Sequence, residues 1–274
     1  MAQRGKYEAE FRKLITDGGT KLGIVEKFRL DGRVTVVTGA SSGLGVAFAR
    51  GFAQAGSDVV LAARRVNKLQ QTAEMIADTG REPLVIATDI ADPAQAQRMV
   101  DAAISRFGRV DVLINNAGIG TARPAVRETP EEFREVIEIN LNGAYWAAQA
   151  CGRVMQPRSA IINISSILGL TTAGLPQAAY SASKAAIMGL TRDLAQQWGS
   201  RNGIRVNAIA PGFFESEMTS QYRAAYLDGV APRILLGRLG DPQELSATAL
   251  WLASDAAGYV TGQTIVVDGG VTIT

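Results

Sequence analysis

Short apolar runs alternate with longer amphipathic stretches along this chain from about residue 33 to its end. Several of the runs are continuous rather than alternating, as a strand requires when both faces of a parallel sheet are covered. We therefore predict strands at Val34–Thr38, Asp58–Ala62, Pro83–Ala87, Val110–Asn115, Ala160–Ile164, Ile204–Ile209 and Thr264–Val267.

The stretches between these runs are long enough for helices that cross from one strand to the next. Repeated strand–helix–strand units predict a doubly wound α/β fold. No Pro/Gly/Ser-rich linker interrupts the pattern, so we expect one domain over residues 31–274 behind an N-terminal arm, residues 1–30. The predicted helices are Gly43–Ala55, Val66–Thr79, Pro93–Phe107, Pro130–Val154, Ala179–Arg201 and Pro242–Ser254.

Composition excludes several classes of protein. The net charge of +2 gives no reason to expect a nucleic acid or an acidic membrane as partner. The chain has no histidine, which excludes Ser-His-Asp hydrolysis and His-ligated metal sites, so we expect no metal. Its single cysteine, Cys151, excludes an internal disulfide. With neither a secretory signal nor a transmembrane run, these features favour a cytoplasmic protein.

The N-terminal arm is mixed and charged. Its stretch Tyr7–Ile15 has apolar residues on one side and is consistent with a short amphipathic helix. We interpret it as a surface arm or a subunit contact.

The first predicted strand runs directly into Thr38-Gly-Ala-Ser-Ser-Gly-Leu-Gly45, and a helical pattern follows at once. Glycines permit the tight turn and the close approach of a pyrophosphate, while the helix N-terminus offers free N–H groups. The Gly-Lys-Ser/Thr of a P-loop is missing, which argues against ATP or GTP. The turn therefore predicts a dinucleotide site that includes Gly39, Ser41, Ser42, Gly43, Leu44 and Gly45.

The end of the second predicted strand indicates which dinucleotide is preferred. NAD-specific sites usually have an acidic residue there to bind the ribose 2′-hydroxyl. This chain has Arg64 and Arg65 instead, and an arginine fork suits a 2′-phosphate. We expect NADP(H) to be preferred, with NAD(H) as the alternative if the two arginines are only solvated.

Three motifs follow one another in order: Thr38–Gly45, Asn115-Asn-Ala-Gly118 and Tyr180-Ser-Ala-Ser-Lys184. Together with Asn140, Ser165-Ser166, Pro211-Gly212 and Val267-Asp-Gly-Gly270, this ordered set resembles the short-chain dehydrogenase/reductase family from about residue 30 to the end. The resemblance implies a Rossmann-type doubly wound parallel sheet. It also implies an NAD(P)-dependent enzyme that interconverts a ketone and a secondary alcohol.

The resemblance further implies a catalytic tetrad of Asn140, Ser166, Tyr180 and Lys184. Lys184 shares a helix face with Tyr180, and a cation beside a phenol lowers the pKa of that phenol from its usual value near 10. Tyr180 is thus expected to act as general acid/base, and Ser166 to stabilise the carbonyl oxygen. Ser165 is a rival for Ser166. Asn140 is expected, from the family, to hold a water that relays protons to Lys184.

The resemblance also implies the rest of the cofactor site. We expect the adenine to lie at the third strand and the adenosine ribose at the Asn-Ala-Gly motif. The nicotinamide ribose is expected at Tyr180 and Lys184, and the nicotinamide carboxamide at the turn after the sixth strand. The corresponding residues are Asp89, Ile90, Asn116, Ala117, Gly118, Pro211, Gly212, Phe213 and Ser216.

A substrate lid is expected over about residues 213–239. The apolar residues in this stretch predict a partly apolar substrate pocket, to which Leu168 and Leu175 contribute from the other side. Its apolar residues are Phe213, Phe214, Met218, Tyr222, Tyr226, Ile234, Leu235 and Leu236.

The substrate stays open at this point. A 3-oxoacyl-(acyl carrier protein) reductase is one alternative: Arg201 resembles one of the two basic residues that this group has near the site entrance, while the other position resembles Pro157, with Arg158 beside it. An NAD-dependent sugar or polyol dehydrogenase is another, and steroid and cyclic-ketone reductases also stay open. A non-catalytic NAD(P) sensor would usually lose the tyrosine or lysine, and an epimerase or dehydratase of the extended branch would be longer. Small residues on two predicted helices, and the C-terminal segment, favour a homotetramer, with a dimer as the alternative.

Overall fold

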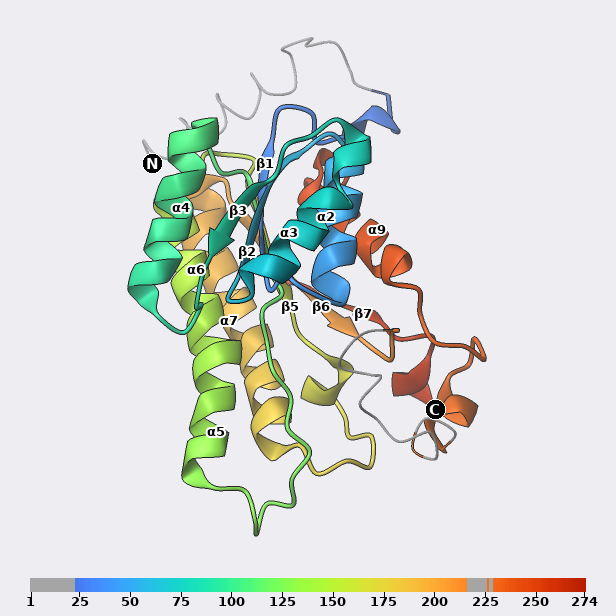
Figure 1. Cartoon of the computed structure of the whole chain (residues 1–274). Coiled ribbons are helices and arrows are strands. Elements are labelled where there is room, and N and C mark those ends of the chain that lie inside the picture. The colour runs from blue at the N-terminus through green and yellow to red at the C-terminus, as the bar shows by residue number, and fades with distance from the viewer. Residues whose placement is uncertain (1–22, 216–225, 227–228) are drawn as a thin grey trace, which may run out of the picture.

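The computed structural model describes residues 23–215, 226 and 229–274. Seven parallel strands form one sheet in the order β3-β2-β1-β4-β5-β6-β7 (Figure 1). The order reverses between β1 and β4, which is where a doubly wound sheet opens a crevice at its carboxyl edge. The strands are β1 Val34–Thr38, β2 Asp58–Ala63, β3 Leu84–Ala87, β4 Val112–Asn115, β5 Ala160–Ile164, β6 Arg205–Pro211 and β7 Thr264–Val267.

Helices cover both faces of the sheet, as the continuous apolar strands require (Figure 1). On one face α2 Leu44–Gln54, α3 Val66–Glu74 and α9 Pro242–Ala253 pack through side chains such as Phe48, Leu69 and Leu245. On the other face α4 Pro93–Phe107, α6 Gly143–Gly152 and α7 Ala178–Asn202 pack through Met99, Ala147 and Leu194. The doubly wound fold is thus confirmed. In the described part of the chain, none of the helices could span a bilayer.

The stretch predicted as one helix, Pro130–Val154, is divided. It consists of α5 Pro130–Ile137, a π-helical turn at Glu138–Asn142 and α6. α5 packs against α7. A π-helical turn inserts one extra residue into the helical ladder and often occurs at functional sites. Here it contains Asn140, one of the predicted site residues.

Several boundaries differ from prediction, and two of these differences have a clear physical cause. Pro83 has no N–H to donate to the ladder, and β3 accordingly begins at Leu84. Leu30 was expected in the N-terminal arm, but its side chain is fully buried and its N–H donates to Ala55 O at 2.9 Å. Leu30 therefore belongs to the core of the domain. The helix expected at Tyr7–Ile15 lies outside the described residues.

Candidate active site

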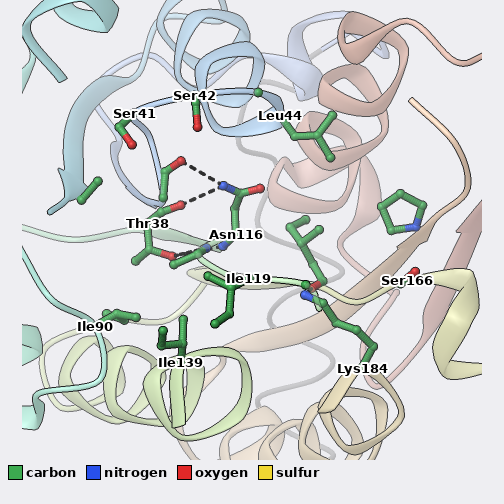
Figure 2. A pocket seen from close by; sticks show the side chains of 18 of the residues that line it. Thr38, Ser41, Ser42, Leu44, Ile90, Asn116, Ile119, Ile139, Ser166 and Lys184 are labelled. Carbon is green, nitrogen blue, oxygen red and sulfur yellow. Dashed lines mark hydrogen bonds between the residues drawn. The ribbon is translucent and has the colours of Figure 1, made fainter. Parts of the chain in front are cut away.

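A cavity of about 490 Å³ follows the carboxyl edge of the sheet. It begins at Arg64 and Arg65 after β2, passes the ends of β1 and β4, and reaches Phe213 and Phe214 after β6. In Figure 2, Ser41 and Ser42 lie on one side of this cavity, and Ser166 and Lys184 lie on the other. The elongated path brings together residues that are up to 176 positions apart in the sequence (Thr38 to Phe214).

The glycine turn is built for close approach of backbone to backbone. Gly39 has a φ of +68°, and a Cβ on it would lie 2.8 Å from Ala117 Cα. Gly43, with a φ of +54°, precedes the first residue of α2, so the free N–H groups of that helix begin at the cavity. Gly45 is buried and does not line the cavity. Its position in the predicted set is instead explained by packing, because a Cβ on Gly45 would overlap Gly39 O.

Asn116 joins the turns that follow β1 and β4. Its side-chain amide donates to Thr38 O at 3.0 Å and to Gly39 O at 3.3 Å (Figure 2). In return, Thr38 Oγ1 accepts from the N–H groups of Asn116 and Ala117, both at 3.1 Å. This exchange fixes the glycine turn against the Asn-Ala-Gly segment on the floor of the cavity.

At the β2 end of the cavity, Arg65 Nη2 donates to Ser42 Oγ at 2.7 Å and to Ser41 Oγ at 3.2 Å. Arg64 is exposed and lines the same end. Asp89 also lines the cavity, and its Oδ1 accepts from Ala91 N at 3.1 Å. Two guanidinium groups and two serine hydroxyls thus gather where the sequence predicts the adenosine phosphate.

Tyr180 and Lys184 lie at the opposite end, on the first turns of α7. Lys184 Nζ lies 5.5 Å from the centroid of the Tyr180 ring and donates to Ile164 O at 2.8 Å. Lys184 is only 4% exposed, and burial lowers the pKa of its ammonium from 10.5 to about 8. The predicted shared face is therefore present, with a cation held beside the phenol.

The two serines after β5 have different surroundings. Ser165 Oγ donates to Lys184 O at 2.7 Å, so its hydroxyl proton is directed to the backbone of α7. Ser166 Oγ accepts from Leu168 N at 3.1 Å, which leaves its own proton able to donate. Both residues line the cavity, but the geometry favours Ser166 as donor to a ligand.

The side chain of Asn140 bonds to protein groups through both its oxygen and its nitrogen. Its Oδ1 accepts from Ile119 N at 2.8 Å, and its Nδ2 donates to Ile119 O at 2.9 Å and to Ser183 Oγ at 3.1 Å. Ser183 Oγ donates in turn to Tyr180 O at 2.7 Å. Asn140 therefore links the segment after β4 to the helix that carries Tyr180.

The remaining predicted contacts divide into three groups. Ile90, Asn116, Ala117, Gly118, Pro211, Gly212 and Phe213 line the cavity. Ser216, Met218 and Tyr222 lie outside the described residues. Leu175 does not line the cavity, and Leu235 and Leu236 are 61% and 68% exposed, so these three leucines do not form the expected pocket wall.

Several lining residues were missed from the sequence. Most of them lie at or shortly after the carboxyl ends of predicted strands, so the carboxyl-edge rule for parallel sheets would have indicated them, whereas Ile139 lies in the π-helical turn. The missed residues are Ala62, Ala63, Thr88, Ile119, Gly120, Ile139, Ile164 and Ile167.

The two arginines considered for a carrier protein lie far from this cavity. Arg201 follows Tyr180 by twenty-one residues on α7, which places it about 30 Å farther along the helix. Arg158 lies before β5, pairs with Asp255, and its N–H donates to Gly203 O at 2.9 Å. Within one chain, neither residue lies at the entrance of the site.

The fold and the site together define a nicotinamide-dependent oxidoreductase of the Rossmann type. A family model described as enoyl-(acyl carrier protein) reductase matches residues 39–272. A 2-dehydro-3-deoxy-D-gluconate 5-dehydrogenase of Dickeya dadantii is 38% identical over 90% of this chain and 98% of its own. A 3-oxoacyl-(acyl-carrier-protein) reductase of Thermotoga maritima is 39% identical over 89% of this chain and all of its own.

Solved structures agree. A short-chain type dehydrogenase/reductase from Mycobacterium marinum matches with a TM-score of 0.88 and 34% identity, over 92% of this chain and all of the other. A gluconate 5-dehydrogenase from Burkholderia cenocepacia, in complex with NADP and tartrate, matches with a TM-score of 0.85 and 35% identity over the same shares. The chain belongs to the short-chain dehydrogenase/reductase family, and it is an NAD(P)-dependent enzyme that interconverts alcohol and carbonyl groups.

Proposed function

We propose that this enzyme prefers NADP(H) and reduces a ketone reversibly to a secondary alcohol, with Tyr180 as general acid/base. One observation carries the proposal. Tyr180, Lys184 and Ser166 converge at one end of a single elongated cavity, while Arg64, Arg65 and two serine hydroxyls converge at its other end. This arrangement suits a dinucleotide whose phosphorylated adenosine half and reactive half bind at opposite ends.

The residues present fit such a cofactor. Gly39 lies where a Cβ would meet the neighbouring segment, and the first N–H groups of α2 begin at the cavity, as pyrophosphate binding requires. Gly39, Ser41, Ser42, Gly43 and Leu44 would hold the phosphates. When bound, the cofactor supplies a hydride to the substrate carbon or accepts one from it.

The tyrosine and its neighbours supply the proton and the electrostatic support. The Tyr180 hydroxyl donates a proton to the carbonyl oxygen during reduction and accepts it back during oxidation. Ser166 donates a hydrogen bond to the same oxygen as negative charge develops on it. Lys184, held by Ile164 O beside the Tyr180 ring, favours the tyrosinate form. Asn140 positions the adjoining segment through Ile119 and Ser183, and it would place any relay water near Lys184.

The preference for NADP(H) rests on charge at the end of β2. Arg64 is exposed at the cavity, and Arg65 already donates to Ser41 and Ser42, so cations and hydroxyl donors surround one position. A 2′-phosphate there would receive charge-assisted hydrogen bonds. The solved relative that carries NADP supports the same assignment.

We further propose that the enzyme works in the cytoplasm as a homotetramer, with a dimer as the alternative. The buried thiol of Cys151 is suited to a reducing compartment. Apolar side chains remain exposed on α5 at Phe133 and in the C-terminal segment at Val266 and Ile273, where subunits would meet. Light scattering after size-exclusion chromatography measures the mass of the assembly directly.

The decisive experiment measures NADPH binding and NADPH oxidation with the wild type and with Tyr180→Phe. We expect the variant to bind NADPH as the wild type does and to lose turnover of every ketone. Tyr259→Phe, at a fully exposed tyrosine, is the matched control and should retain full activity. A ketone panel that includes an acetoacetyl thioester also tests the carrier-protein alternative. Normal turnover by Tyr180→Phe would refute the mechanism, and tight binding without turnover by the wild type would favour a sensor.

A further inference from the structure

The two ends of the cavity differ sharply in charge. Arg64, Arg65 and Asp89 lie at the adenosine end, after β2 and β3. At the end that holds Tyr180, the charged side chain among the described lining residues is Lys184. The substrate must therefore bind where the described surroundings offer one cation.

The ammonium group of Lys184 is already hydrogen-bonded within the protein. Lys184 is 4% exposed, and its Nζ donates to Ile164 O at 2.8 Å beside the Tyr180 ring. Pairing with a substrate carboxylate would draw the ammonium away from the position that supports Tyr180. The site thus has no described cation available to neutralise an anionic substrate.

The wall around Tyr180 is apolar and continuous. Ile119 and Leu168 pack in one cluster with Tyr180, and Leu168 also packs in the next cluster with Ile167 and Phe213. These five residues line the cavity together with Phe214. The ring of Tyr226 meets Phe213 edge to face at a centroid distance of 6.2 Å and packs against the same cluster.

Such a wall discriminates between polar and apolar substrates through the cost of removing polar groups from water. A carboxylate or a row of hydroxyls placed against aliphatic and aromatic side chains loses its hydrogen bonds to water and gains none. An apolar ring or chain placed there gains burial instead. Ser166 and Tyr180 supply the polar contacts that the reacting oxygen needs.

Resting on the proposed function, we propose that the physiological substrate is a neutral ketone flanked by apolar groups, such as an alicyclic or aryl ketone. It is not a polyhydroxylated sugar acid, although relatives of this chain bear the names of dehydrogenases for such acids. Leu168, in contact with both clusters, is the residue that sets this preference.

Two pairs of substrates of similar size test the proposal. NADPH oxidation is measured with 4-ethylcyclohexanone and with 4-oxocyclohexanecarboxylate, and then with 2-tetralone and 5-keto-D-gluconate. We expect kcat/KM to be at least about 100-fold higher for the neutral, apolar member of each pair. Equal or better turnover of the anionic members would overturn the substrate class and leave the oxidoreductase function intact. Turnover of no ketone, despite NADPH binding, would overturn both.

A charge introduced at Leu168 provides the second test. Leu168→Arg should raise kcat/KM for 4-oxocyclohexanecarboxylate at least about 10-fold and lower it for 4-ethylcyclohexanone, because the wall then offers a cation. The backbone N–H that donates to Ser166 is retained. Leu170→Arg, at a leucine that is 53% exposed in the next turn, is the matched control and should change neither value. If Leu168→Arg does not bind NADPH, Leu168→Lys replaces it, because it also places a cation at the wall. An unchanged preference in a variant that binds NADPH would contradict the role of Leu168.

Discussion

Asn140 and Ile119 form a reciprocal pair of hydrogen bonds, in which the side-chain amide of Asn140 bonds both the backbone N–H and the backbone C=O of Ile119. The donor–acceptor distances are 2.8 Å for Ile119 N to Asn140 Oδ1 and 2.9 Å for Asn140 Nδ2 to Ile119 O. Asn140 is 1% exposed and lies in the π-helical turn between α5 and α6. Its side chain thus fixes the segment that follows β4 and borders the reacting end of the cavity.

Asn140→Ala should lower both stability and activity. It leaves the N–H and C=O of Ile119 without these partners, which costs roughly 1–3 kcal/mol of unfolding free energy. Urea unfolding measures that loss, and steady-state kinetics measures kcat. Asn142→Ala is the control, because Asn142 lies in the same turn but bonds the exposed carboxylate of Glu138. A variant with wild-type stability and reduced kcat would show that Asn140 acts through a water relay alone.

Alanine substitutions of the two serines after β5 should have different effects on kcat and on stability. Ser166→Ala is expected to lower kcat about 10²–10³-fold with unchanged NADPH affinity, because it removes a donor to the developing oxyanion. Ser165→Ala removes the hydrogen bond to Lys184 O, so it should lower unfolding free energy by about 1 kcal/mol and leave most of kcat. The opposite ranking of the two kcat values would assign the catalytic role to Ser165.

Arg64→Asp should shift the preference from NADPH towards NADH. A carboxylate repels the 2′-phosphate and can accept from a ribose hydroxyl, so the ratio of kcat/KM for NADPH to that for NADH should fall at least about 10-fold. Arg98→Asp on α4 introduces the same charge change at an exposed residue outside the cavity and should leave the ratio unchanged. If Arg64→Asp also leaves it unchanged, Arg65 is the residue that binds the phosphate.

Gly45→Ala should impair cofactor binding and stability together. The added methyl would overlap Gly39 O and would lie 2.9 Å from Asn116 Nδ2, so the turn must shift, at a cost of about 1–3 kcal/mol. Gly199→Ala on α7 is the contrasting variant, since a Cβ there meets no atom within 4 Å. It should stabilise the protein by up to about 1 kcal/mol. Equal NADPH affinities for the two variants would contradict the close-packed turn.

Lys184→Met should stabilise the protein at neutral pH while abolishing activity. Burial lowers the lysine pKa from 10.5 to about 8, which corresponds to a cost on the order of 3 kcal/mol when the lysine is charged in both states. Between pH 8 and 10.5 the unfolded chain binds more protons than the native protein, so wild-type stability rises with pH there. The excess Tm of Lys184→Met at pH 7 should therefore shrink towards pH 10.5. A constant difference across this range would mean that the buried ammonium carries no such cost.

The sequence predicts most of this architecture because five of the seven strands, β1, β2, β4, β5 and β6, are largely buried. β1, β5 and β7 agree with their predicted bounds residue for residue, since continuous apolar runs leave little ambiguity. The π-helical turn at Asn140 was not predicted, because one extra residue barely alters an amphipathic period. Within this turn Asn140 bonds to Ile119, which lies twenty-one positions earlier in the chain, and a local pattern does not show such a contact.

The site, like the fold, has features that the sequence predicts and others that it does not. Motif order places Tyr180, Lys184 and the glycine turn correctly around one cavity. The contact of Arg65 with Ser41 and Ser42, and the different surroundings of Ser165 and Ser166, depend on side-chain directions. A linear pattern does not encode such directions, so these distinctions required the structure.

The strand order has a consequence for the biogenesis of the enzyme. β1 pairs with both β2 and β4. Thr35 pairs with Val112, so the chain between these two residues must fold back before β1 and β4 can pair. The cavity is bordered by residues from Thr38 to Phe214, so a ribosome must have released most of the polypeptide before a complete dinucleotide pocket exists. Pairing between such distant segments is slow, and a ligand that binds only the finished pocket stabilises the folded state. A dinucleotide would therefore stabilise a newly made chain only late in its folding, after segments as far apart as Thr38 and Phe214 have come together.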